Sequence, residues 1–298
     1  MSGWLKYLTR VLSKRSPASA QLCPPRIELP AGSIPEQWRA WHASNAGDYA
    51  ALLTDDPFVR WRPESSHASM VESNLEYALT LKYVDKDSEL CEAFLDRALA
   101  TAERMRTEIG SWKHNGPSEQ MRLERGEAYA RWIKTGELDR DRLRTAYGYA
   151  TLDATEVVYG DWDDGDYDPE GARLANAHVK ESALLAAARL ALVAGDYALC
   201  DEALDHFRTG DYPFHRKMRD ALAMASPALA GGSATLLDAA REPIAEVLNV
   251  LRPVWPTVEH FYGARLAAFE LAVIQAGLDA PDTGPPSLDR VYAAIMAE

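Results

Sequence analysis

The apolar positions along the chain recur with helical spacing almost throughout. Leu90, Phe94 and Ala98, for example, are four residues apart, which places their side chains on one face of a helix. Runs of alternating β-branched residues, the pattern typical of strands, are almost absent. The sequence therefore predicts an all-α protein, a helical bundle or solenoid of stacked antiparallel helix hairpins.

Residues that start and stop helices divide this pattern into elements. Pro169 between Asp168 and Glu170 is one such start, because proline suits the first helical position and acids suit the positive end of the helix dipole. The helix that begins there is rich in alanine and is expected at the centre of the fold. The predicted helices cover about 35–47, 65–84, 88–110, 118–135, 141–159, 169–194, 197–208, 213–225, 234–250, 257–277 and 287–297.

The N-terminal part differs from the rest. Residues 3–14 have the pattern of a short amphipathic helix, and a proline-rich linker follows it. The helix is expected either to dock on a membrane surface or partner, or to fold back on the body. We therefore divide the chain into a basic arm, 1–35, and a helical domain, 36–298. That domain forms one continuous stack or two lobes, 36–160 and 168–298, joined by an acidic loop.

The charge of the chain restricts its partners. The formal net charge is −13, and residues 1–27 hold five basic residues and no acid, so the remainder carries −18. Such a body is unsuited to nucleic acid, whose binding needs Lys and Arg to neutralise phosphates. It is suited to attracting a basic protein.

Cysteine usage and the apolar runs indicate the compartment. The three cysteines are far apart and form no paired motif, and Cys91 and Cys200 fall on predicted helices as small apolar residues, as is usual in a reducing compartment. Lys6 and Arg10 interrupt any secretory signal, and the longest apolar run, 183–194, is too short to span a membrane. We expect a cytoplasmic protein without stable membrane insertion.

A tripeptide, Gly-Asp-Tyr, occurs four times, and one copy, Gly195, Asp196 and Tyr197, directly joins the predicted helix that ends at 194 to the one that begins at 197. Glycine is expected to end one helix in the left-handed conformation, and aspartate to cap the next. Around this turn, residues 180–213 resemble one unit of the tetratricopeptide family, with Leu184, Ala187, Ala188 and Pro213 at matching places. The resemblance implies stacked helical hairpins, whose grooves bind peptides or domains.

The most unusual stretch runs from 153 to 170 and holds eight acids and no basic residue. Four interpretations stay open: a calcium loop, a catalytic magnesium site, a protein-binding loop, or a solvated acidic loop. The calcium loop lacks its closing glutamate, because Ala177 occupies that position, and no second acidic motif completes a magnesium site. We predict a protein-binding loop whose contact residues are Asp161, Trp162, Asp163, Asp164, Asp166, Tyr167 and Asp168.

The residue types of common active sites do not assemble into a motif. The seven histidines are scattered, although His178 and Glu181 stand three apart on one helix and are expected to be neighbours. No phosphate-binding glycine loop or nucleophile motif is present in the sequence. We therefore expect binding rather than catalysis, with no cofactor and no bound metal.

In general style, the acidic helical body resembles the immunity proteins with which bacteria neutralise their own polymorphic toxins. That resemblance implies a partner that is a basic toxin or effector domain, whose active or substrate-binding site this chain would cover. Two alternatives remain from the sequence. One is a metal-dependent enzyme that uses the 161–168 acidic loop, and the other is a tetratricopeptide-style adaptor that binds peptides in a groove.

Overall fold

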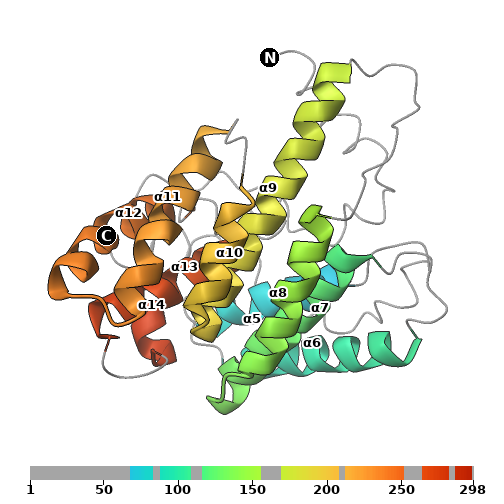
Figure 1. Ribbon diagram of the computed structural model, residues 1–298. Coiled ribbons are helices and arrows are strands. Elements are labelled where there is room, and N and C mark those ends of the chain that lie inside the picture. The colour runs from blue at the N-terminus through green and yellow to red at the C-terminus, as the bar shows by residue number, and fades with distance from the viewer. Residues whose placement is uncertain are drawn as a thin grey trace, which may run out of the picture.

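The computed structural model describes residues 68–82, 88–108, 116–155, 169–207, 212–251, 264–281 and 286–296. These ranges contain ten α-helices and no strand, which confirms the all-α prediction (Figure 1). The helices are α5 (Ala68–Thr80), α6 (Ser88–Glu108), α7 (Pro117–Thr135), α8 (Arg140–Thr155), α9 (Pro169–Ala194), α10 (Tyr197–Asp205), α11 (Pro213–Leu229), α12 (Ala234–Leu251), α13 (Ala264–Asp279) and α14 (Leu288–Met296). The predicted basic arm, 1–35, and the predicted helix at 35–47 lie outside the described residues.

One predicted boundary is wrong for a physical reason. The helix expected at 213–225 continues to Leu229 and contains Pro227. Proline lacks the backbone N–H donor, but near the end of a helix this removes a single hydrogen bond. The helical hydrogen-bond pattern resumes after Pro227, because the N–H of Ala230 donates to the carbonyl of Ser226 at 3.0 Å. Pro243, in α12, is accommodated inside a helix as well.

Left-handed glycines end the helices where the sequence predicted. Gly136 has φ +80° and its N–H donates to the carbonyl of Trp132 at the end of α7. Gly195 has φ +80° between α9 and α10. Asp196 is the N-cap residue of α10, as predicted, and its carbonyl accepts from the N–H of Cys200 at 3.2 Å, but its side chain makes no capping hydrogen bond. Its carboxylate instead accepts a hydrogen bond from Nε of Arg144 at 2.7 Å, a charge-assisted contact that ties the turn to α8.

Consecutive helices pack against one another, and two of them also join parts that are distant in sequence. The 26-residue α9 packs against α8, α10, α11 and α13. In turn, α13 contacts α5, α11, α12 and α14, so the last part of the described chain meets the first (Figure 1). Together, α9 and α13 form the centre around which the other helices are arranged.

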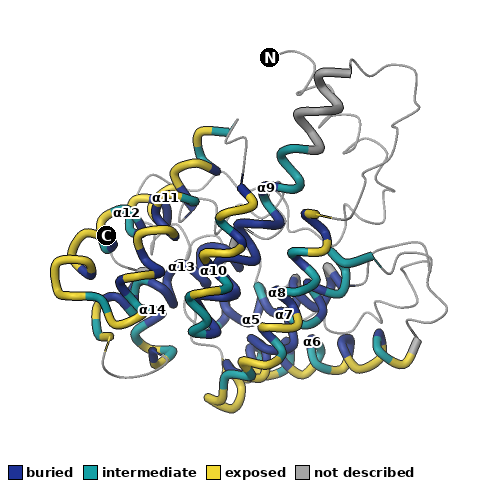
Figure 2. Tube along the Cα trace, viewed as in Figure 1, coloured by how far each residue is buried: buried dark blue, intermediate teal, exposed yellow. Residues whose placement is uncertain are grey.

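The composition of α9 explains its central place. Every residue from 183 to 194 is buried, and half of these positions are alanine. Small side chains let neighbouring helices approach closely, so this stretch can be covered on several sides, as predicted. Figure 2 shows the pattern: exposed residues lie on the outer faces of the surrounding helices, whereas the middle of α9 is buried.

Aromatic side chains fix α7 against α13. The rings of Tyr129 and Phe269 meet edge to face at 5.3 Å, and those of Trp132 and Phe269 at 5.8 Å. Phe269 is fully buried, which confirms its predicted place in the core, while Phe261 lies outside the described residues. The buried apolar side chains from α5 to α14 form one continuous cluster.

Both cysteines within the described ranges are buried and free, as predicted. Burial raises the pKa of the Cys200 thiol to about 12, so this thiol remains protonated at neutral pH. No helix in the described part of the chain combines the length and the apolar character that crossing a membrane requires.

Two glycines inside helices provide a test of the packing. A Cβ at Gly126, on α7, would lie 2.7 Å from Cγ1 of Val71 on α5, whereas a Cβ at Gly148, on α8, would meet nothing within 4 Å. Alanine at an open helical site gains about 0.5–1 kcal/mol, so Gly148→Ala should raise the free energy of unfolding. Gly126→Ala should lower it by about 1–3 kcal/mol, because overpacking forces the two helices apart.

Urea unfolding followed by circular dichroism measures both changes. In a Val71→Ala background the penalty of Gly126→Ala should shrink, since the clashing methyl group is removed. If Gly126→Ala were as stabilising as Gly148→Ala, the close contact of α5 and α7 would be refuted.

Candidate functional site

Four charged side chains meet in the interior, one from each of α5, α7, α9 and α13. Glu72, Arg125, Arg189 and Glu270 are between 0 and 6% exposed. Nε of Arg125 donates to Oε1 of Glu72 at 2.8 Å, and Nε of Arg189 donates to Oε2 of Glu270 at 2.7 Å. Nη1 of Arg125 lies 3.7 Å from Oε1 of Glu270. The charges therefore alternate along one chain, which we call the central charge cluster, and their formal sum is zero.

Neighbouring groups complete this cluster. The hydroxyl of Tyr129 donates to Glu270 at 3.2 Å, and Nη1 of Arg189 donates to the sulfur of Met218 on α11 at 3.0 Å. Burial disfavours a charged guanidinium, but Glu72 and Glu270 outweigh this effect and raise the pKa of Arg125. Burial, with the charge of Glu270, also raises the pKa of Tyr129, so its hydroxyl stays a donor. Arg125 and Tyr129 therefore both keep their protons at neutral pH.

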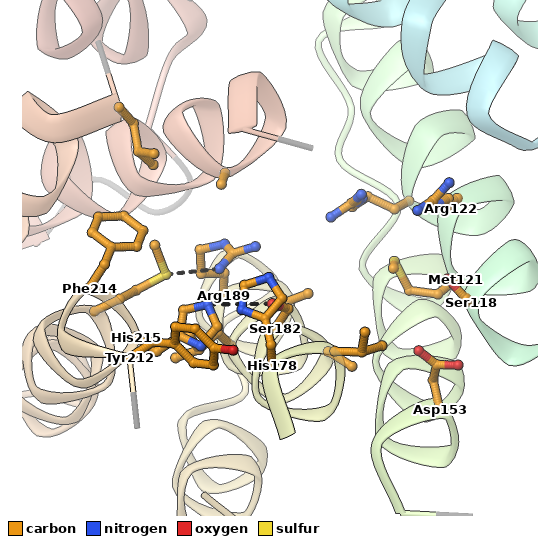
Figure 3. A pocket seen from close by; sticks show the side chains of 18 of the residues that line it. Ser118, Met121, Arg122, Asp153, His178, Ser182, Arg189, Tyr212, Phe214 and His215 are labelled. Carbon is orange, nitrogen blue, oxygen red and sulfur yellow. Dashed lines mark hydrogen bonds between the residues drawn. The ribbon is translucent and has the colours of Figure 1, made fainter. Parts of the chain in front are cut away.

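A cavity of about 510 Å³ lies beside the central charge cluster. Figure 3 shows its two walls. One wall comes from α7 and α8 and presents Ser118, Met121, Arg122 and Asp153. The opposite wall comes from α9, α11 and the residue that precedes α11, and presents His178, Ser182, Arg189, Tyr212, Phe214 and His215. A cavity of this size, with a few polar groups among apolar ones, has the dimensions of a small-molecule site.

Two stacked histidines form part of the α9–α11 wall. The rings of His178 and His215 are 4.8 Å apart and nearly parallel, and Tyr212 meets His178 edge to face at 4.7 Å. Nδ1 of His215 is 2.9 Å from Oε2 of Glu181, and its Nε2 is 3.4 Å from the hydroxyl oxygen of Ser182. The predicted pair of His178 and Glu181 thus omitted the hydrogen bond that Glu181 makes with His215, 34 residues away.

A second network of charges joins α6, α7 and α8 nearer the surface. Arg106 binds Glu124 at 2.9 Å and also binds Glu127, while Nη1 of Arg142 lies 2.6 Å from Glu124 and 3.1 Å from Glu127. Each cation is shared by two carboxylates, so the network cross-links three helices. Its geometry indicates a structural role.

The residues predicted to contact a partner, Asp161, Trp162, Asp163, Asp164, Asp166, Tyr167 and Asp168, lie outside the described residues, between α8 and α9. The described part has an acidic surface of its own on α10. Asp201, Glu202 and Asp205 are exposed there, and no ion pair joins them to any other described residue. Among the described side chains, no group of three or more His, Cys, Asp or Glu is placed to hold a metal ion.

The central charge cluster should be sensitive to the loss of any one member. Glu270→Gln leaves Arg189 and Arg125 buried with too little negative charge. Removal of one partner from a buried pair costs about 3–5 kcal/mol, so the free energy of unfolding should fall by about that amount. Lys217→Ala, which removes an exposed pair with Glu246 on the surface, should cost less than about 1 kcal/mol. Equal effects of the two variants in urea unfolding would contradict the structural role of the cluster.

His178, one of the two stacked histidines, should make stability depend on pH. Burial, and then the neighbouring His215, lower the pKa of His178 below its ordinary value of 6.5. As pH falls below 6.5, the unfolded chain binds a proton that folded His178 resists, so stability is lost from there down to the lowered pKa. His178→Gln should therefore lose less stability between pH 8 and pH 5.5 than the parent chain. Chemical denaturation at several pH values measures the two slopes, and identical slopes would contradict the prediction.

Comparison with known proteins identifies no relative from which a function could be inferred. No family model matches the chain, and no curated protein or solved structure matches it. Any function must therefore be inferred from the chemistry of the central charge cluster, the cavity and the acidic surface of α10.

Proposed function

We propose that this chain is a binding protein that recognises a basic protein surface and inhibits it, in the manner of an immunity protein that covers the active or substrate-binding site of a toxin domain. The partner would be a basic toxin or effector domain, met in the cytoplasm. The observation that carries the proposal is the acidic surface of α10, where Asp201, Glu202 and Asp205 are exposed without an ion pair to any described residue.

The cost of this arrangement supports the proposal. Asp201 and Asp205 are four residues apart on one helix, a spacing at which like charges repel each other, and α10 contains no basic residue. The preceding Asp196, by contrast, is paired with Arg144. A basic partner would relieve the repulsion and would be attracted by it from a distance.

The helix that carries these acids is firmly anchored. Cys200 and Ala203, on the opposite face of α10, are buried, and α10 packs against both α9 and α11. The acids are therefore presented on a fixed framework, which reduces the entropy lost when a partner binds.

The acidic segment 161–168 supplies the second part of the proposal. Its acids would extend the attraction for a basic surface, and Trp162 and Tyr167 would provide the aromatic contacts that dominate many interfaces. Residues 28–298 carry a net charge of −18, so the electrostatic field around this part of the chain is negative and attracts a basic partner.

Capture of the partner, followed by inhibition, tests the proposal. The tagged full chain would be recovered from its native cells, and any stoichiometric partner would be purified and titrated by calorimetry at two salt concentrations. We expect a basic protein whose toxic activity disappears at one equivalent of this chain. A captured protein that keeps its activity, or that is not basic, would reject the inhibitor function.

Charge reversal locates the contact. Asp201→Lys with Glu202→Lys and Asp205→Lys should weaken the partner's affinity at least about tenfold, since charge pairs in an interface each contribute about 1 kcal/mol or more. Asp163→Lys with Asp164→Lys and Asp166→Lys tests the segment in the same way. The matched control reverses three exposed acids elsewhere, Glu89, Glu103 and Glu242, and should change affinity far less. An equal loss in the control would show attraction by net charge alone, and no loss in either test variant would refute both contacts.

A further inference from the structure

We propose that the cavity beside the central charge cluster binds a small organic anion with one negative charge, such as a carboxylate or sulfonate, and an apolar body. The site is independent of the protein-binding surface proposed above. Its volume of about 510 Å³ lies within the range of small-molecule pockets, and seven helices, α5, α7, α8, α9, α11, α12 and α13, contribute to its lining.

The charges around the cavity determine which ligand fits. Arg125 and Arg189 line it, but their charges are balanced by Glu72 and Glu270 at hydrogen-bond distance. Asp153 also lines it and has an interaction partner of its own. None of these groups needs a ligand to complete its contacts.

Arg122 differs from the other cations of the cavity. Its one ion contact within the described residues is to Oε2 of Glu72 at 3.9 Å, beyond hydrogen-bond distance, and Oε1 of Glu72 is occupied by Arg125. A guanidinium carries five N–H donors, so Arg122 keeps donors for a further acceptor. Its side chain is 27% exposed, which means that it is accessible yet partly removed from water. A singly charged anion with two oxygens matches this planar donor group.

The rest of the lining fits an apolar body. Met121, on the same wall as Arg122, faces Phe214, Tyr212 and the stacked imidazoles across the cavity (Figure 3). Because the pKa of His178 is lowered, this ring is uncharged at neutral pH and offers an aromatic face. A multiply charged ion such as inorganic phosphate would find one open cation and much apolar surface, so it fits less well than an organic anion.

Two fluorescent probes of the same ring system test the inference. Anilinonaphthalene sulfonate carries the anion, and phenylnaphthylamine is its uncharged counterpart. The folded full chain at neutral pH should bind one equivalent of the sulfonate saturably. Arg122→Gln should weaken sulfonate binding about tenfold, the worth of one charge-assisted hydrogen bond, and should change binding of the neutral probe less than about twofold. Arg122→Lys, which keeps the charge, should retain part of the affinity.

The controls separate the site from general effects. Arg140, at the start of α8, is exposed and forms no ion pair with any described residue, so Arg140→Gln removes the same charge from the surface and should leave both probes unaffected. Thermal melting of each variant confirms that it is folded. Equal effects of Arg122→Gln on both probes, an equal effect of Arg140→Gln on the sulfonate, or no saturable sulfonate binding would each overturn the proposal.

Discussion

The alternation of Glu72, Arg125, Glu270 and Arg189 in the interior is the constraint on which the arrangement of the helices depends. A buried charge without a partner is far more costly than most packing defects, so each of these residues requires the helix that carries its partner. Apolar packing alone would tolerate several ways of placing α13 against α5, α7 and α9, because it is not directional. The charges select one of them, and the edge-to-face contacts of Phe269 with Tyr129 and Trp132 are consistent with the same choice.

The cavity follows from the same constraint. Ser182, Ala183 and Ala186 are the small residues that α9 places along its lining, and two long side chains of the lining, Arg125 and Arg189, are engaged with carboxylates. Such arginines cannot move into the space without giving up their partners, and the small residues do not fill it. A volume therefore remains between the α7–α8 wall and the α9–α11 wall. The polar interior that fixes the fold thereby also produces a site that a purely apolar core would have closed.

Local features of this fold could be predicted from the sequence, and pairings between distant residues could not. Helix periodicity, the left-handed Gly136 and Gly195, and the burial of the alanine-rich stretch of α9 depend on residues close in sequence. The sequence also indicates that two members of the central charge cluster are buried, since Arg189 and Glu270 are each a single charged residue within an apolar run. What the sequence lacks is the partner: Arg189 and Glu270 are 81 residues apart, and Glu181 and His215 are 34 apart. The same reasoning explains Asp196, which locally suits a cap but in the fold meets Arg144.

Two groups of charges in this protein thus respond differently to their surroundings. Those of the central charge cluster are neutralised by one another and are shielded from salt, whereas the acids on α10 face water and lack an ion pair within the described structure. Added salt should therefore weaken the attraction for a basic protein, which acts through the exposed acids. The same screening reduces the repulsion that a chain of net charge −13 exerts on an approaching organic anion. Because the contact at Arg122 is partly buried beside an apolar lining, binding in the cavity should tolerate salt far better than binding on the surface, so the two kinds of recognition can be distinguished by ionic strength.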